Sequence, residues 1–165
     1  MTNDAPWLDE QQQRVWRAWL TVNIQLNAAL ARQMHADTGL SLPDFEVLVL
    51  LTDTASERIR VSDLAKGLQW ERSRLSHHLT RMEKRGLVER AECPDDGRGA
   101  LVLLTPGGRA AIEAAAPAHV RLVRELFVDR LDAIDLADLD RVLGTLLAGL
   151  DPEAAARAYS TSKVG

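Results

Sequence analysis

Apolar residues recur every three or four positions along most of this 165-residue chain, which predicts a mainly helical protein. A first helix is expected over residues 8–35, and Gly39 follows it as a typical helix stop. A second helix is expected to begin at Ser41, with Pro43 in its first turn, and to end near Asp53. The apolar stripe of the first helix consists of Val15, Trp19, Val22, Leu26 and Ala29.

The centre of the chain predicts a short helix, a tight turn and a longer helix. Ser62 is a favoured N-cap for the short helix, residues 63–68. The longer helix, residues 71–85, stops at Gly86, a residue suited to a left-handed C-cap, but its start is weakly specified because the residues there are poor caps. Its apolar stripe is formed by Leu75, Leu79 and Met82.

Two apolar runs, residues 87–93 and 100–104, flank a turn-forming segment and predict a two-stranded ribbon. Thr105 then caps a helix whose first position is Pro106. A last helix carries a regular leucine seam, which is typical of coiled-coil packing. The seam consists of Leu136, Leu139, Leu143, Leu146 and Leu150.

The leucine seam has two interpretations. It can pack inside one chain, or it can join two copies. The apolar helices at both ends of the chain flank a small central module that offers too little surface to cover them, which favours a homodimer.

Charge is unevenly distributed along the chain. The whole protein has a formal net charge of −4 and an isoelectric point near 5.6. Residues 66–90, however, hold seven Lys or Arg and three Glu, a net charge of +4, so the rest carries −8. Because screening limits a charge to about 8 Å, an acidic total is compatible with a basic face that binds nucleic acid.

The helix over residues 71–85 has such a face. With Leu75 at the buried centre and about 100° per residue, the opposite side presents a hydroxyl, an imidazole and cationic groups. Arginine suits bidentate contact with guanine, and serine and lysine suit phosphates. The alternative is an ordinary solvated charged helix. The candidate DNA-contacting residues are Arg72, Ser73, Arg74, His77, Arg81 and Lys84.

The ribbon tip adds two more candidates. Arg98 is placed to reach into a narrow minor groove, and Asp96 is placed to hold its guanidinium in one orientation. An Asp-Gly turn without a DNA role is the alternative interpretation.

These segments together resemble the MarR family of bacterial winged-helix transcription factors. The resemblance spans roughly residues 8–150. Its specific parts are the run LTRMEKRGLVER ending at Arg90, the wing with Asp96 and Arg98, and the Leu104-Thr105 junction. It implies a triangular homodimer in which residues 71–85 form the recognition helix and Arg98 is the wing residue.

Two departures from the family pattern qualify this expectation. Many relatives have a second basic residue at the wing tip where this chain has Gly97, so a weaker minor-groove contact is expected. Relatives that sense hydroperoxides use a cysteine in the first helix. Here the lone Cys93 lies at the base of the wing, where a small buried filler is favoured over a redox sensor.

The expected fold is mainly α-helical with a small β-wing: a winged helix-turn-helix module with dimerisation helices at both ends of the chain. The expected divisions are an N-terminal dimerisation helix (1–36), a DNA-binding domain (37–108), C-terminal dimerisation helices (109–150) and a tail (151–165). The expected function is a homodimeric DNA-binding regulator of transcription that reads an inverted repeat in double-stranded DNA, and more specifically a repressor. A winged-helix module that binds proteins instead of DNA is the alternative.

The family resemblance also implies a small aromatic or phenolic effector bound between the dimerisation helices and the winged module. Trp16, Trp19, His35 and His78 are the candidate lining residues. For the tryptophans, core or interface filling is the alternative. His78 lies about 60° from the centre of the buried stripe, which favours a structural histidine facing the interior.

Other functional classes lack support in the sequence. The longest uncharged run is 14 residues, too short for the ~20 apolar residues of a bilayer span, and no secretory signal is apparent, so a cytoplasmic protein without membrane contact is expected. Neither a nucleophile elbow nor an H-E-x-x-H motif occurs, so no catalytic residue is expected. His77 and His78 point in different directions and cannot bind one metal ion, so no metal site is expected. No cofactor is expected either.

Overall fold

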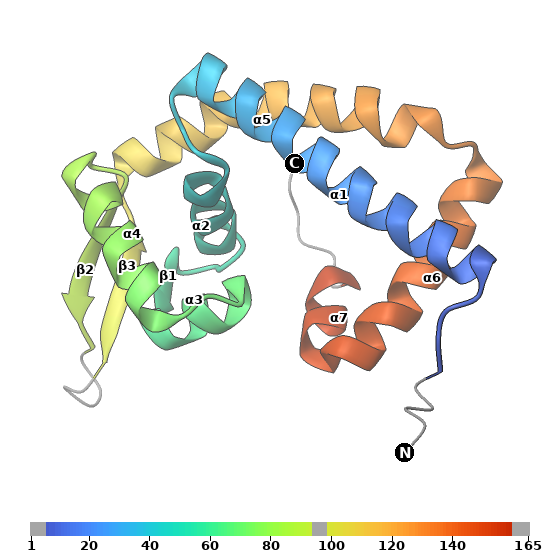
Figure 1. The fold of residues 1–165 in the computed structure, drawn as a ribbon. Helices are drawn as coiled ribbons and strands as arrows, with labels where there is room; N and C mark the ends of the chain where they lie inside the picture. Colours follow the sequence, from blue (N-terminus) through green and yellow to red (C-terminus); the bar gives the residue numbers. More distant parts are fainter. Residues whose placement is uncertain (1–5, 94–98, 160–165) are drawn as a thin grey trace.

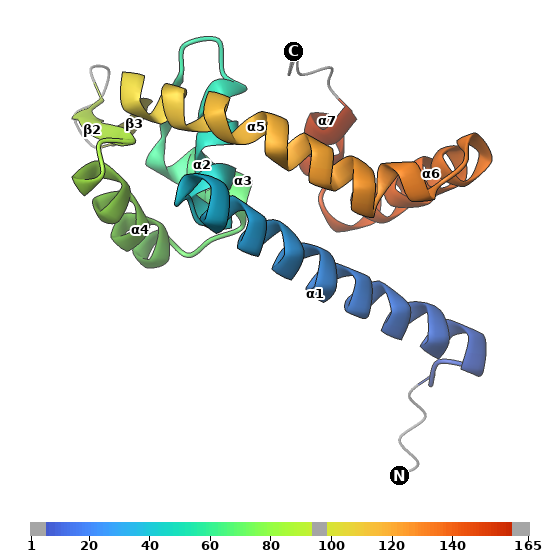
Figure 2. The same cartoon turned by 90° about the horizontal axis from the view of Figure 1, so that it is seen from above.

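The computed structural model describes residues 6–93 and 99–159. A lobe at one end of the molecule holds the sheet and the helices of residues 42–84, and the long helices extend away from it (Figures 1 and 2). The elements in chain order are α1 (Glu10–Thr38), α2 (Leu42–Thr52), β1 (Arg58–Arg60), α3 (Val61–Leu68), α4 (Arg72–Lys84), β2 (Val88–Glu92), β3 (Ala100–Leu104), α5 (Pro106–Leu126), the 3-10 turn η1 (Val128–Arg130), α6 (Ala133–Leu150) and α7 (Pro152–Tyr159).

The end of the first helix and the start of the second lie at the signals that the sequence indicates. Gly39 has a φ of 68° and closes α1 in the left-handed conformation that glycine adopts without strain. The Ser41 side chain accepts a hydrogen bond from the amide of Asp44, whose carboxylate accepts one from the Ser41 amide. This capping box confirms the predicted start of α2.

The start of α3 differs from the prediction. The helix begins at Val61, one residue before Ser62, and Arg60 occupies the N-cap position without a side-chain cap bond. The reason is a strand that the sequence analysis does not predict: β1 pairs with β3 and leads directly into α3. Because the backbone leaves an extended strand at Arg60, the helix starts there.

The wing is therefore a three-stranded antiparallel sheet rather than a two-stranded ribbon. Its strand order is β1-β3-β2, so β3 is the central strand (Figure 1). Val102 at its centre is fully buried and pairs with Ile59 on one side and Arg90 on the other. The outer strand β1 ties α3 to the wing.

The lobe has a core shared by all its helices. The fully buried side chains include Leu48 and Leu51 of α2, Leu64 of α3, and Leu75 and Leu79 of α4. Gly86 ends the turn after α4 with a φ of 69°. Since α4 is held along its inner side by this core, its outer side has a fixed direction.

The long helices contribute only a few side chains to this core, among them Met34 of α1 and Ile112 of α5, and leave many large apolar side chains exposed. The Thr105 hydroxyl accepts the amide of Gly108 and caps α5, as predicted, and α5 packs along α1. α6, which is described along its whole length, has no buried residue. A short helix that the sequence analysis does not predict, α7, follows it. No helix in the described part of the chain is both long and apolar enough to cross a bilayer.

Candidate nucleic-acid interface

The outer side of α4 carries the predicted basic face. All of its candidate side chains are exposed, whereas Leu75, His78, Leu79 and Met82 are buried on the inner side. The helix therefore separates the two sets as its sequence indicates. The exposed candidates are Arg72, Ser73, Arg74, His77, Arg81 and Lys84.

Not every basic residue of this region belongs to that face. Lys66 pairs with Glu153 of α7, Arg85 pairs with Asp44, and Arg90 pairs with Glu83. These three cations hold elements together. The excess positive charge of residues 66–90 is therefore concentrated on α4.

Arg74 is held by an aromatic ring. Its Cζ atom lies 4.2 Å from the centre of the Trp70 ring, in a cation–π contact. Trp70 is positioned by the turn before α4, where Gln69 has a φ of 54° and the Trp70 amide donates to the carbonyl of Ala65. The turn thus helps to determine where Arg74 lies.

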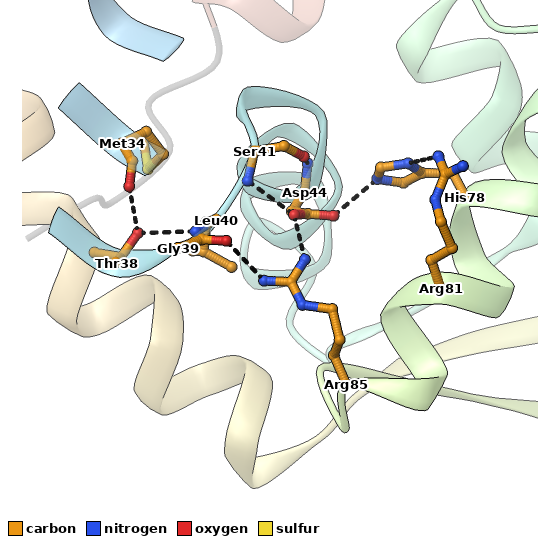
Figure 3. A network of polar contacts seen from close by, with 9 residues as sticks. All are labelled: Met34, Thr38, Gly39, Leu40, Ser41, Asp44, His78, Arg81 and Arg85. Carbon is orange, nitrogen blue, oxygen red and sulfur yellow. Dashed lines mark hydrogen bonds and ion pairs between the residues drawn. The ribbon is translucent and has the colours of Figure 1, made fainter. Parts of the chain in front are cut away.

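Arg81 is held by a histidine (Figure 3). Its Nη2 lies 3.0 Å from Nδ1 of His78, and Nε2 of His78 lies 3.0 Å from Oδ1 of Asp44 on α2. His78 is 6% exposed, which confirms the predicted inward position. Burial lowers the pKa of His78, and although Asp44 opposes this shift, the neighbouring Arg81 adds to it.

Asp44 is the fixed end of this network. Its other carboxylate oxygen accepts hydrogen bonds from the Ser41 amide at 2.9 Å and from Nη1 of Arg85 at 2.7 Å. Burial raises its pKa, but these hydrogen bonds outweigh burial and leave the pKa below its usual value. Arg85 also donates to the carbonyl of Gly39, so the end of α4 is tied both to the end of α1 and to the start of α2 (Figure 3).

A second set of polar contacts joins α4 to the wing. Nε of Arg90 on β2 lies 2.8 Å from Oε2 of Glu83, and its Nη2 lies 3.1 Å from the hydroxyl of Thr80. The hydrogen bonds from Arg90 lower the pKa of Glu83 despite some burial. The helix and the sheet are therefore fixed relative to each other.

Comparison with known proteins shows which family has this sequence and fold. The sequence model of the MarR family matches residues 40–99. The chain is 39% identical to AbsC, a MarR-family transcriptional regulator from Streptomyces coelicolor, with a TM-score of 0.83 over 88% of this chain and 98% of AbsC. The chain belongs to the MarR family.

Two further relatives agree with this assignment. Sco3205, a MarR-family regulator from Streptomyces coelicolor solved in complex with DNA, is 37% identical, with a TM-score of 0.85 over 91% of this chain and 94% of Sco3205. YdgJ, an HTH-type transcriptional regulator of Bacillus subtilis, is 32% identical over 63% of this chain, a stretch that spans 62% of YdgJ. The MarR family and these relatives are transcriptional regulators, which are not enzymes.

In this MarR-family chain the predicted wing-tip residues, Asp96 and Arg98, lie outside the described residues. The base of the wing is described: the Cys93 amide donates to the carbonyl of Gly99, and Cys93 is buried. The predicted filler position of Cys93 is thus confirmed.

The four residues predicted to line an effector site are not brought together. Trp16 and Trp19 are exposed on the part of α1 that lies away from the lobe, and His35 is exposed near the other end of α1. His78 is buried on the inner side of α4. Their role in effector binding stays a prediction.

A cleft of about 510 Å³ instead lies between the long helices and the lobe, with walls from α1, α2, α3 and α5. The rings of Phe45 and His119 stand 4.6 Å apart at its edge. Burial lowers the pKa of His119, and its Nδ1 is buried without a hydrogen-bond partner among the described residues. Burial also raises the pKa of Glu46, another lining residue, although Arg74 opposes this shift.

Sequence reasoning missed both the cleft and the Asp44–His78 contact. Asp44 is recognisable as a capping-box residue, but nothing local indicates that it meets a side chain 34 positions later. Phe45 and His119 are 74 positions apart, and His119 stands in an alanine-rich stretch without a motif. Within residues 6–93 and 99–159, no cluster of three or more His, Cys, Asp or Glu side chains is arranged to hold a metal ion.

Proposed function

We propose that this chain is a homodimeric, sequence-specific DNA-binding repressor of transcription whose DNA complex is released by a small aromatic ligand. The observation that carries the DNA-binding part is the exposed basic face of α4, held on the lobe core. The DNA complex of the relative Sco3205 supports it. We place the protein in the cytoplasm, where it has access to the chromosome.

In this proposal α4 enters the major groove. Arg74 and Arg81 contact guanine edges, Ser73 and Lys84 contact phosphates, and Arg72 and His77 lie beside them. Arg98, oriented by Asp96, enters the neighbouring minor groove. Two copies related by a twofold axis then read an inverted repeat with half-sites about 34 to 36 Å apart.

The dimer accounts for the exposed apolar side chains of the long helices. We assign residues 1–36 and 109–150 to dimerisation, and residues 37–108 to DNA binding. Soluble monomers rarely expose large contiguous apolar patches, and a dimer interface would cover these side chains. The exposed apolar residues on these helices include Val15, Trp16, Trp19, Ile134, Leu136, Val142, Leu146 and Leu150.

The cleft between the long helices and the lobe is the candidate effector site. Its volume of about 510 Å³ suits a small aromatic molecule. Phe45 and His119 offer ring faces, and the unpartnered Nδ1 of His119 offers a polar contact to a phenol or an acid. Ligand relief requires that the effector bind more tightly to a dimer whose half-site spacing does not match DNA, because equal affinity for both forms shifts nothing.

Selection of bound fragments from a random duplex pool tests the DNA-binding part. Enrichment of an inverted repeat with half-sites one helical turn apart is expected, and enrichment of no sequence would contradict it. Phenolic acids titrated into the complex with the selected DNA test the ligand part. Release by at least one compound is expected, with His119→Ala weakening it, and no release by any of them would contradict ligand relief.

A further inference from the structure

One buried side chain, His78, is linked to two of the three arginines on the basic face, Arg81 and Arg74. Its ring accepts a hydrogen bond from Arg81. The same ring packs edge-to-face against Trp70, and the guanidinium of Arg74 lies over the Trp70 ring. We propose that His78 is a positioning residue that orients Arg81 and Arg74 for base recognition before DNA arrives. This inference rests on the proposed DNA-binding function and assigns a role to a residue that does not itself reach the DNA.

The contact with Arg81 fixes the tautomer of His78. A guanidinium can only donate hydrogen bonds, so Nδ1 of His78, 3.0 Å from Arg81, must be the acceptor. The ring proton is then on Nε2, which faces Oδ1 of Asp44 at 3.0 Å. A chain of close polar contacts therefore runs from Asp44 on α2 through His78 in the interior to Arg81 on the exposed face (Figure 3).

Asp44 anchors that chain firmly. It is 3% exposed, and its second oxygen is occupied by the Ser41 amide and by Arg85. His78 therefore cannot rotate without leaving a buried carboxylate oxygen unpaired, which is costly. The contact uses one of the five N–H donors of Arg81, and the fork geometry leaves others for a guanine.

The second arginine is supported through an aromatic stack. The Trp70 and His78 rings are perpendicular with their centres 5.3 Å apart, and the Arg74 guanidinium lies over Trp70. Edge-to-face packing of this kind fixes the indole plane. Ordering two long side chains in the free protein lowers the entropy lost on binding and restricts the directions they can adopt, which favours specificity.

Substitutions at His78 can separate these supports. His78→Phe keeps a ring against Trp70 but removes the acceptor for Arg81. His78→Asn can keep an acceptor near the position of Nδ1, whereas His78→Gln can keep only the donor toward Asp44. Met82→Leu, a conservative change of another buried side chain on the same helix, is the matched control.

The experiment measures affinity for the selected operator and for operators with single base-pair changes. A bidentate Arg–guanine contact discriminates by roughly 5- to 150-fold. At the base pair where Arg81→Ala loses discrimination, His78→Phe should lose at least about fivefold, and the double variant should lose no more than Arg81→Ala alone. Discrimination at the Arg74 position should be retained in His78→Phe, as should all discrimination in Met82→Leu.

The proposal is overturned if the His78→Phe and Arg81→Ala losses multiply, if discrimination is unchanged, or if affinity falls equally for all sequences. If His78→Phe does not fold, the comparison of His78→Asn with His78→Gln tests the proposal. His78→Asn should retain discrimination at the base pair read by Arg81, and His78→Gln should lose it. Equal discrimination by the two variants overturns the proposal. A wild-type protein that selects no sequence would instead refute DNA binding itself.

A readout without DNA tests the tautomer independently. Nitrogen-15 NMR of the histidine side chains in the free protein should show His78 protonated on Nε2 only. Protonation on Nδ1 would contradict the contact with Arg81.

Discussion

The lobe and the long helices differ in how far their apolar side chains are buried. The lobe encloses its own core: Leu75 of α4 is fully buried by residues of the same chain. α6, by contrast, buries no residue, and Leu146 and Leu150 are 52% and 83% exposed. One chain is therefore sufficient to bury the core of the lobe, whereas the exposed surface of the long helices would be covered by a second copy in the proposed dimer. In the proposed dimer, α4 belongs to the lobe, and its distance from the α4 of the second copy is set by the long helices.

The largest effect is expected from a charge placed on the exposed seam of α6. Leu146→Asp would force an unpaired carboxylate from each copy into an apolar interface, at a cost of ~3 kcal/mol or more per copy. The protein should become monomeric at micromolar concentration by analytical ultracentrifugation while the lobe stays folded. Thr145→Asp, on the opposite side of α6, should leave the dimer intact. A dimeric Leu146→Asp protein would remove the seam from the interface.

A core substitution in the lobe should affect folding rather than assembly. Leu75→Ala removes a fully buried side chain and should lower the free energy of unfolding by about 2 to 5 kcal/mol. Chemical denaturation of the dimer at fixed protein concentration measures the loss. Leu146→Ala, the same change on the exposed seam, should leave lobe unfolding nearly unchanged. Equal losses in lobe stability would erase the distinction between the two regions.

Arg98→Ala tests the wing with a smaller effect. Removal of one phosphate or groove cation should lower the slope of log affinity against log salt by about one unit and weaken many sequences alike. Binding titrations at several salt concentrations give the slope. Arg124→Ala, an exposed cation paired with Asp129 at the end of α5, is the control and should not change the slope. An unchanged slope in Arg98→Ala would exclude the wing residue from the DNA contact.

Acid should weaken the fold through two histidines, the buried His78 of the lobe and the half-buried His119 of α5. Burial lowers the pKa of both His78 and His119, so the unfolded chain takes up protons first as the pH falls below 6.5. Stability should therefore be full above that pH and decline below it until the folded pKa values are reached. His119→Phe should flatten this decline in pH-dependent denaturation, whereas His77→Gln, on the exposed face, should not. A wild-type profile that is flat from pH 7 to 5 would contradict the burial effect.

The comparison also shows which features a sequence can predict. α1, α2 and the two faces of α4 follow from helical periodicity and local caps such as Ser41 and Gly39, because these signals lie within a few residues. β1 escaped notice because three residues, Arg58–Arg60, with one apolar side chain carry no periodicity; the pairing partner lies more than 40 positions away. The same strand moved the start of α3 away from Ser62.

The candidate site likewise has features that the sequence predicts and features that only the packing of the chain determines. The directions of Arg74, Arg81 and His78 on α4 follow from 100° steps along one helix. Their partners do not, because Asp44 meets His78 only when α2 and α4 pack together. The cleft beside His119 depends on four helices at once and leaves no local trace in the sequence.

The central claim is that two copies of α4 read DNA together at a fixed separation. Its most direct test inserts five base pairs between the half-sites of the selected operator, which rotates one half-site by about half a turn on B-DNA. Affinity of the dimer should fall at least ~100-fold toward that of a single half-site, since each half-site contributes several base and phosphate contacts. Unchanged affinity for the extended operator would contradict the claim.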